Sequence, residues 1–247
     1  MSFPIQISTF TPHPSDMHRE ASASEHVSRT KRGIADTGKR WPDGIVNIAL
    51  DLRDNRSKAL VIDALREWAH HTPALQFNVV DGKEGDIRIS DDEGLQGNWS
   101  EIGTDAENTP LDEPTMHLDR NDDSAVFRTT ALHEIGHALG MEHEHQHPAN
   151  TINWDKDYVY KSMSDSEGWD ADTVEINMFS THTGPDLLLS PYDDRSIMHY
   201  HINVGETIDG KAVPPNYSLS KGDQAIIRTL YTPSRFKGSD ANSTAYR

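Results

Sequence analysis

The sequence contains no cysteine among its 247 residues. This absence excludes disulfide bonds, thiolate metal ligands and a cysteine nucleophile. The sequence also lacks any apolar run of about 18 to 20 residues, the length that a membrane-spanning helix requires. Basic residues are scarce, since 23 Lys and Arg stand against 40 Asp and Glu, and the formal net charge is −17. Such an acidic surface argues against nucleic acid and anionic membranes as partners.

A secretory leader is also not visible, because the beginning of the chain lacks a basic segment followed by an apolar one. Three locations stay open: the cytoplasm, export by a route without such a leader, and secretion after a leader has been removed. Mean hydropathy is −0.71 and the apolar fraction is 34%. These values are typical of a polar, soluble chain with many loops.

Hydrophobic patterning divides the chain into three parts. Residues 1–40 show no sustained periodicity and are expected to form an arm or a propeptide-like tail. Residues 41–232 are expected to form one domain with two lobes, 41–143 and 144–232. Residues 233–247 are expected to form a C-terminal tail.

Strand and helix signals alternate in the first lobe, whereas the second lobe is irregular. The expected strands of the first lobe are residues 45–50, 75–80, 86–90, 96–103 and 115–119. One long helix is expected at residues 57–70 and another ends in the histidine-rich segment described below. The second lobe has expected helices at residues 155–165, 169–180 and 219–231, the last of them a closing helix. This order predicts an α/β (α+β) fold with a twisted, mostly parallel sheet.

The most informative stretch is residues 133–147, which read HEIGHALGMEHEHQH. The segment before it has helical spacing, and residues 122–124 are candidate helix caps. Because His133 and His137 are four residues apart, they lie on one face of the helix and can chelate one divalent ion. Glu134 lies beside them and can reach a water on that ion without being a ligand itself.

Gly140 is expected to end this helix, because a left-handed glycine commonly lets the chain reverse direction. The reversal would bring His143 to the same ion as a third ligand, and the offset from Gly140 selects His143 over His145 and His147. Three protein ligands leave one tetrahedral position open, as in a catalytic zinc site. The complete pattern H-E-x-x-H-x-x-G-x-x-H is typical of metzincin zinc peptidases. The expected cofactor is one catalytic Zn²⁺ in a cleft between the lobes of a metzincin-like fold.

A methionine turn follows the histidines, in the order that metzincins show: residues 196–200 read SIMHY. Within the metzincins the sequence resembles the astacin family, because Glu144 directly follows the third histidine and Tyr200 stands two positions after Met198. RWPDGIVNIAL resembles the first strand of that family, GNWSEIG its substrate-binding strand and YSLSKGDQAIIRTLY its closing helix. The resemblance covers residues 40–231.

The resemblance implies a zinc-dependent endopeptidase that hydrolyses peptide bonds through a metal-activated water. It implies that the three histidines bind zinc and that Glu134 is the general base and acid. Tyr200 would be a switchable additional zinc ligand whose hydroxyl moves to the oxyanion during turnover. Met198 and Gly140 would support the site, and Glu144 would be linked to the N-terminus of the mature enzyme.

A protein or peptide substrate is expected to bind in extended form, pairing its backbone with an edge strand. The residues of that strand are Asn98, Trp99, Ser100, Glu101 and Ile102. We expect a monomer without nucleic-acid or membrane partners. Animal members of the family carry two disulfides, so this chain resembles a bacterial-type member that is stabilised by packing alone.

Two alternative functions stay open on the sequence. One is another metzincin branch, against which Glu144 and Tyr200 argue. The other is a zinc-bearing binding module without catalysis, which would be marked by loss of Glu134 or of a ligand. The dibasic step Lys31-Arg32 suggests cleavage near Gly33 during maturation, and an unprocessed arm packed on the domain is the open alternative. The acidic residues 91–94 lack the alternating spacing of a calcium loop and are expected to form an ordinary loop.

Overall fold

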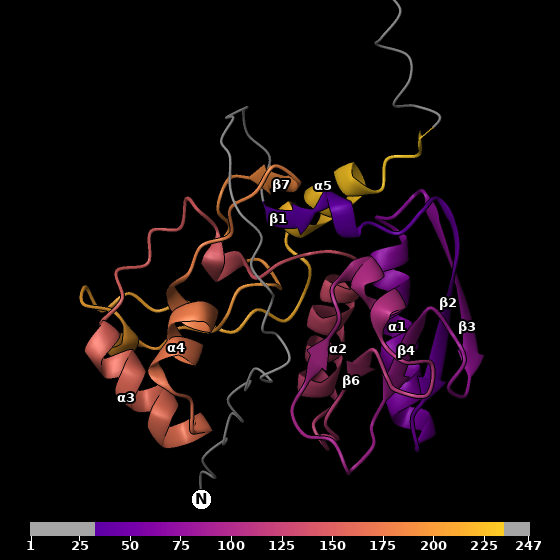
Figure 1. Ribbon diagram of the computed structural model, residues 1–247, viewed down its shortest axis with the longest axis horizontal. Coiled ribbons are helices and arrows are strands. Elements are labelled where there is room, and N and C mark those ends of the chain that lie inside the picture. Colours follow the sequence, from indigo (N-terminus) through magenta and orange to yellow (C-terminus); the bar gives the residue numbers. More distant parts are fainter. Residues whose placement is uncertain (1–32, 235–247) are drawn as a thin grey trace, which may run out of the picture.

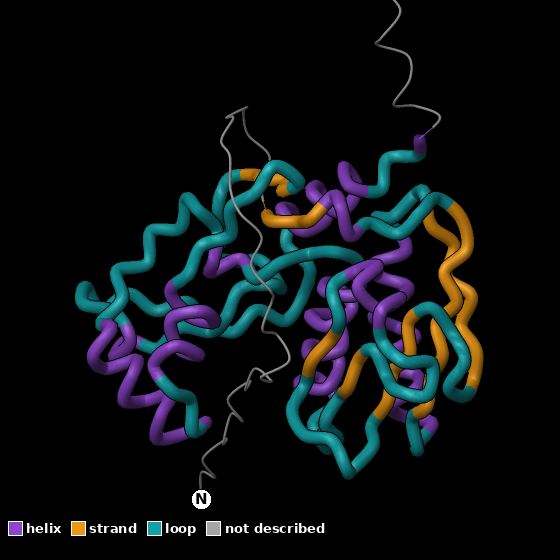
Figure 2. The backbone as a smooth tube through the Cα atoms, viewed as in Figure 1, coloured by secondary structure: helices purple, strands orange, loops and turns teal. Residues whose placement is uncertain are grey.

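The computed structural model describes residues 33–234 (Figure 1). Most of the predicted arm, the Lys31-Arg32 step and residues 235–247 of the predicted tail lie outside these residues. The described chain is an α/β body in which a five-stranded sheet packs against two long helices, as the trace in Figure 2 also shows. The fold class predicted from the sequence is confirmed. Among the described residues, none of the helices combines the length and the apolar character that crossing a bilayer requires.

The sheet has the strand order β3-β2-β4-β6-β5, and only the β5–β6 pair is antiparallel. Its strands are β2 (Gly44–Asp51), β3 (Leu75–Asp81), β4 (Ile87–Ser90), β5 (Trp99–Ser100) and β6 (Met116–His117). The apolar segment Ile45–Leu50 pairs with β3 on one side and β4 on the other, and its alternate residues Val46, Ile48 and Leu50 face the core. The mostly parallel sheet is therefore as predicted.

The predicted substrate strand lies at the edge of the sheet but is shorter than residues 96–103. Only Trp99 and Ser100 join the ladder with β6. Gly97 and Gly103 flank this pair with φ angles of +78° and +51°, and a left-handed backbone ends an extended strand. One further backbone hydrogen bond extends the pairing, from Glu101 N–H to the Thr115 carbonyl at 2.8 Å.

The two long helices are α1 (Asn55–Ala69) and α2 (Ser124–Ala138). Asp54 caps α1 through the Ser57 N–H, and Asp123 caps α2 through the N–H groups of Ala125 and Val126. Each cap satisfies backbone donors that a helix N-terminus leaves without partners. The capping residue therefore sets where α2 begins, and with it the position of the histidines along the helix.

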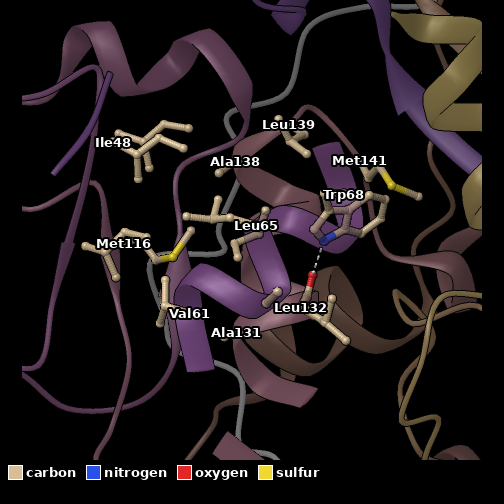
Figure 3. Close-up of a cluster of buried hydrophobic side chains, with 14 of the residues drawn as sticks. Ile48, Val61, Leu65, Trp68, Met116, Ala131, Leu132, Ala138, Leu139 and Met141 are labelled. Atoms are coloured by element: carbon tan, nitrogen blue, oxygen red, sulfur yellow. Dashed lines mark hydrogen bonds between the residues drawn. The ribbon is translucent and has the colours of Figure 1, made fainter. Parts of the chain in front are cut away.

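The two helices pack on each other and on the sheet around one large apolar core (Figure 3). Trp68 of α1 is fully buried, and its indole N–H donates to the Leu132 carbonyl of α2 at 2.9 Å. Leu132 is the residue immediately before the first histidine of the motif. This bond therefore ties α1 to the turn of α2 that enters the site.

After α2 the chain forms α3 (Lys156–Glu167), α4 (Ala171–Val174) and the π-helical turn η5 (Glu175–Phe179), then β7 (Leu187–Ser190) and α5 (Lys221–Leu230). Figure 1 shows α3 and α4 across α2 from the sheet, as a second group of helices, whereas β7 and α5 lie beside β1 (Gly33–Asp36). Single 3-10 turns are η2 (Thr37–Lys39), η3 (Gly103–Asn108), η4 (Glu144–Gln146) and η6 (Val204–Glu206). The helix expected at 169–180 is thus split into α4 and the wider turn η5.

Residues 33–40, which the sequence analysis placed in the arm, belong to the folded body. Strand β1 (Gly33–Asp36) pairs with β7 in a separate antiparallel ladder. Ile34 and Ala35 within it are fully buried, because α5 packs against this ladder. A strand of four residues is too short to show a clear alternation in the sequence, and its partner is about 150 residues away. The other domain boundaries remain predictions.

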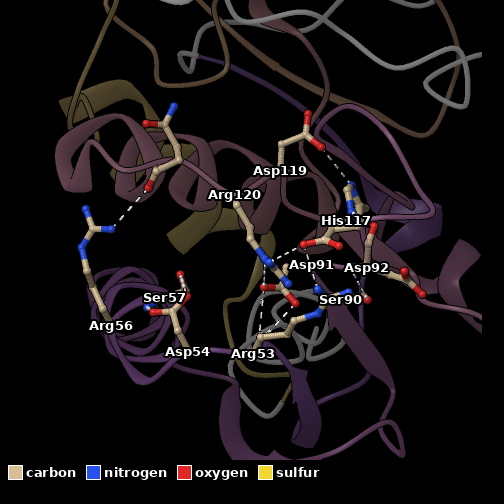
Figure 4. A network of polar contacts seen from close by, with 12 residues as sticks. Arg53, Asp54, Arg56, Ser57, Ser90, Asp91, Asp92, His117, Asp119 and Arg120 are labelled. Carbon is tan, nitrogen blue, oxygen red and sulfur yellow. Dashed lines mark hydrogen bonds and ion pairs between the residues drawn. The ribbon is translucent and has the colours of Figure 1, made fainter.

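The acidic segment at residues 91–94 is a loop, as predicted (Figure 4). The buried carboxylate of Asp91 accepts hydrogen bonds from Arg120 Nε at 2.9 Å and from the Arg53 backbone N–H at 3.2 Å. Arg120 also binds Glu93 at 2.6 Å. The guanidinium groups of Arg120 and Arg53 therefore pair with the carboxylates of this loop.

Candidate metal centre

The first two histidines stand one turn apart in the buried half of α2. Their Nε2 atoms are 3.1 Å apart and their ring centroids 4.8 Å apart. The rings are held from behind: His133 Nδ1 lies 2.8 Å from the Ile197 carbonyl, and His137 Nδ1 lies 2.8 Å from the Met141 carbonyl. Each Nδ1 must donate to its carbonyl, so in the neutral ring each Nε2 presents a lone pair.

Gly140 ends α2 as predicted, with a φ of +90°. The Met141 N–H bonds the Gly136 carbonyl at 3.0 Å and the Gly140 N–H bonds the His137 carbonyl at 2.7 Å, which is the hydrogen-bond pair of a Schellman C-cap. The chain then reverses and returns His143 to the first two histidines. Its Nε2 lies 3.3 Å from that of His133 and 3.0 Å from that of His137.

Three ring nitrogens of the described residues thus converge on one point, and His133, His137 and His143 are the group there that could hold a metal ion. Zinc bound tetrahedrally at about 2.0–2.1 Å from each nitrogen places such nitrogens about 3.3–3.4 Å apart, close to the distances found. Lone pairs facing one another in a buried space repel unless a cation lies between them. The donor set therefore fits zinc.

Burial also sets the protonation state of these rings. It lowers the pKa of His133 to about 4, against the opposing effect of the hydrogen bond to Ile197. Burial and the neighbouring imidazoles hold the pKa of His143 well below its usual value. Both rings are therefore neutral near pH 7, which is the form that ligates metals.

Glu134 follows the first ligand directly in α2, and its side chain is buried at 1% exposure. A carboxylate at this place shares the low-dielectric surroundings of the histidines, where electrostatic effects are stronger than in water. Its position one residue from His133 is the one that the motif predicts for a group beside the ion.

The methionine turn lies directly against α2. Met198 is fully buried, and a Cβ added to Gly136 would overlap its sulfur. The N–H of Glu144 donates to the Met198 carbonyl at 3.0 Å, which joins the segment after the third ligand to this turn. Met198 thus packs under the helical turn that carries the ligands, where the sequence placed it.

Tyr200 is buried beside the third histidine. Its ring lies edge-on to His143 with centroids 4.4 Å apart and is stacked on His145 with centroids 4.1 Å apart. His145 is itself held by the Asn177 carbonyl, 2.7 Å from its Nε2. Tyr200 therefore stands next to the triad, and His145 supports its ring.

Glu144 lies behind the site rather than in it. Its Oε1 accepts the Asp193 N–H at 2.7 Å, and its side chain has no solvent exposure. Burial raises the pKa of Glu144 to about 9, although the bond from Asp193 works in the opposite direction. Glu144 is therefore protonated near pH 7. The N-terminal partner implied by the resemblance falls outside the described residues.

Two residues important to the site were missed by the sequence analysis. Gly136 lets the helix approach Met198, and an isolated glycine inside a helical pattern is a recognised signal of close packing. Asp223 of α5 binds Ser196 and Ile197 in the methionine turn. Its helix-capping pattern with Ser220 is visible in the sequence, but its contact with a turn 26 residues away is not.

Comparison with known proteins agrees with this geometry. Residues 33–223 match the model of the peptidase family "Astacin". The structure is similar to that of myroilysin, with a TM-score of 0.75 and 34% identity over 81% of this chain and 98% of that chain. The hatching enzyme HCE-1 of Oryzias latipes shares the fold, with a TM-score of 0.54 and 19% identity over 80% of this chain and 96% of that one.

Two curated relatives also match. Zinc metalloproteinase nas-19 of Caenorhabditis elegans is 26% identical over 179 residues, which are 71% of this chain and 40% of that protein. Meprin A subunit alpha of Mus musculus is 28% identical over 183 residues, 70% of this chain and 21% of that protein. The chain thus spans less than half the length of these relatives. The family match includes the histidine segment and the methionine turn, and it removes the alternative of another metzincin branch: the chain belongs to the astacin family of peptidases.

Proposed function

We propose that this protein is a zinc-dependent endopeptidase. The observation that carries the proposal is the convergence of three buried imidazole nitrogens, His133, His137 and His143, at mutual distances of 3.0–3.3 Å. Membership in a peptidase family supports it, and nas-19 is named a zinc metalloproteinase.

The three histidines would hold a single zinc ion. When bound, zinc supplies a Lewis acid that activates water and polarises a peptide carbonyl. Glu134 then takes a proton from the attacking water and delivers it to the leaving amine, as a general base and acid does. The burial of Glu134 keeps bulk water from competing for that proton.

Tyr200 would stabilise the charge that develops on the carbonyl oxygen, by donating its hydroxyl proton in a hydrogen bond. In the resting site the same hydroxyl is proposed as an additional, switchable zinc ligand. The Tyr200 ring packs edge-on against His143 and stacks on His145, which places it beside the triad. Met198, Gly140 and Glu144 would support this arrangement without touching the substrate.

The substrate would be a protein or peptide bound in extended form along the edge of the sheet. Within residues 33–234, strand β5 is the last strand of the sheet and pairs only with β6, on its inner side. Its outer edge, with Asn98, Glu101 and Ile102 continuing the segment, offers backbone groups for an added strand. We propose that the enzyme works as a monomer, without nucleic-acid or membrane partners.

The test is hydrolysis of a fluorogenic peptide by wild type and by Glu134→Ala, with metal analysis of both after dialysis. We expect about one zinc per chain in both proteins and at least about 100-fold less hydrolysis by the variant. 1,10-Phenanthroline should abolish the wild-type activity, and added zinc should restore it. Zinc bound without hydrolysis by wild type would favour the binding-module alternative instead.

A further inference from the structure

We propose that Asp223 is a positioning residue of the metal centre: through the methionine turn it fixes the imidazole of His133. The proposal rests on the zinc peptidase function argued above. Asp223 lies in the first turn of α5 and its side chain is 1% exposed. It is 90 residues along the chain from His133.

Both carboxylate oxygens of Asp223 accept hydrogen bonds from the chain around the methionine turn. Oδ1 accepts from the Ser196 hydroxyl at 2.6 Å, and Oδ2 accepts from the Ile197 N–H at 2.8 Å. Oδ2 also accepts from the N–H of Ser220, the cap of α5, at 2.8 Å. The Ser196 oxygen in turn accepts the Met198 N–H at 3.0 Å. The Asp223 carboxylate therefore binds Ser196 and Ile197 directly and Met198 through the Ser196 hydroxyl.

The same peptide segment is the partner of the first ligand. Ile197 gives its N–H to Asp223, and its carbonyl receives the Nδ1 proton of His133 at 2.8 Å. A ligand histidine is oriented by the acceptor at its second nitrogen, and such partners affect metal affinity strongly. Asp223 thus determines where the acceptor for His133 stands.

A helix cap alone does not account for this carboxylate. The N-cap carboxylates of three other helices, Asp54, Asp123 and Asp170, are exposed, where a charge keeps its hydration, and that of α3, Asp155, is half-buried. Asp223 is buried, and burial raises its pKa to about 6 against the effect of its hydrogen bonds. Burying a charge costs free energy. We therefore assign the buried carboxylate of Asp223 to positioning the methionine turn, whose Ser196 and Ile197 donate to it.

The experiment measures the metal affinity of the full-length, metal-free protein by competition with a chromophoric chelator for Zn²⁺. The variants are Asp223→Ala, which removes all three acceptor bonds, and Asp223→Asn, which keeps one acceptor oxygen. Ser220→Ala is the matched control, because it removes the side-chain cap of α5 and the hydroxyl's bond to Asp193 but leaves the bonds of Asp223 to Ser196 and Ile197. Thermal unfolding of each sample shows that it is folded.

We expect Asp223→Ala to bind zinc about 10-fold more weakly than wild type, which is the low end for substitutions at partners of metal ligands. The zinc affinity of Asp223→Asn should lie between those of wild type and Asp223→Ala. Ser220→Ala should lower the melting temperature while its zinc affinity stays within about twofold of wild type. A Ser220→Ala affinity as weak as that of Asp223→Ala would assign Asp223 to capping only and overturn the proposal.

Wild-type affinity in Asp223→Ala would overturn it as well. If Asp223→Ala does not fold, the Asn variant decides: a folded Asn variant with unchanged affinity contradicts the proposal, and a loss of a few-fold supports it. Failure of the proposed function is distinguishable: without a zinc site, wild type would bind no zinc in the same titration, and in a binding module wild type would bind zinc but hydrolyse no peptide.

Discussion

The hydroxyl of Tyr200 can be removed without disturbing its ring, because the ring contacts with His133, His143 and His145 are aromatic. Tyr200→Phe should therefore test the hydroxyl alone. Loss of one donor to an oxyanion lowers kcat by about 100-fold or more, and KM should change far less because the contact forms mainly in the transition state. Steady-state kinetics on one peptide measures both constants.

Tyr192→Phe is the matched control for this prediction. Its hydroxyl lies 2.6 Å from His199 Nε2, close to the same turn, but belongs to no proposed catalytic group. Its kcat should stay near the wild-type value. An effect of Tyr200→Phe on KM alone would remove Tyr200 from the oxyanion site.

His182 makes a pH-dependent contribution to stability. Burial, followed by the charge of Lys39, lowers its pKa to about 4, while Asp36 acts in the opposite direction; Glu142 lies 3.7 Å away. The unfolded chain, with a pKa of about 6.5, takes up the proton first as the pH falls. The contribution of His182 is thus present above about pH 6.5 and is lost between about 6.5 and 4.

His182→Gln should flatten this loss, because glutamine can still bond the Gln146 side chain but does not titrate. The side chain of His182 is 21% exposed, so we expect about 1–2 kcal/mol rather than the full value of the shift. Urea unfolding of both proteins at several pH values gives the difference. Parallel stability curves from pH 7 to 4 would show that His182 is not the group responsible.

At the scale of elements, the contact between α2 and the methionine turn depends on a missing side chain. Alanine is the better helix former by about 1 kcal/mol, so Gly136→Ala would stabilise an isolated helix. Here the added Cβ would overlap Met198 Sδ and approach Trp68. Overpacking of this kind costs about 1–3 kcal/mol, so we expect Gly136→Ala to lower the free energy of unfolding and the zinc affinity.

The double variant Gly136→Ala/Met198→Ala provides the control. Removing the sulfur frees the space that the new methyl group needs, so the two substitutions should cost less together than the sum of their separate effects. Denaturant unfolding of the four proteins gives this coupling. Strict additivity would mean that Gly136 and Met198 do not share the contact.

Local signals predicted the elements that are defined by local interactions. The long helices α1 and α2, the cap of α2 and the left-handed end at Gly140 follow from periodicity and capping residues. Strand β1 could not be predicted, because its partner β7 lies far along the chain. The π-helical turn at Glu175–Phe179 has the same apolar spacing as an ordinary helix and differs only in its hydrogen bonds.

The candidate site follows the same division between near and distant residues. The positions of the three histidines were predictable because one helix and one glycine turn connect them within eleven residues. The residues that hold the site in place were not predictable, because their hydrogen bonds join segments that are distant in the sequence. These residues are Asp223, Asn177 and Ile197. Spacing along the chain carries no information about such contacts.

At the scale of the whole molecule, a chain without disulfides must hold its parts together by packing. The large core includes residues from both ends of the described chain: Ala35 of β1 and Ile226, Ile227 and Leu230 of α5 lie in the same cluster as the sheet and α2. A smaller cluster of buried apolar side chains, which includes Trp169 and Tyr200, packs the second group of helices together. The closing helix therefore belongs to the first core, and the proposed zinc ion would lie where these parts meet.

Zinc should therefore stabilise the entire fold. Its three ligands converge only in the native chain, so binding favours the folded state by about 4 kcal/mol when free zinc exceeds the dissociation constant about 1,000-fold. For a domain of this size each kcal/mol raises the melting temperature by about 2–4 °C, so zinc should raise it by about 8–16 °C over the chelator-treated protein. Calorimetry in zinc-buffered and metal-free solutions measures this shift. His143→Ala should show almost none of it, because two histidines from one helix do not close the site; a shift as large as in wild type would mean that zinc binds elsewhere.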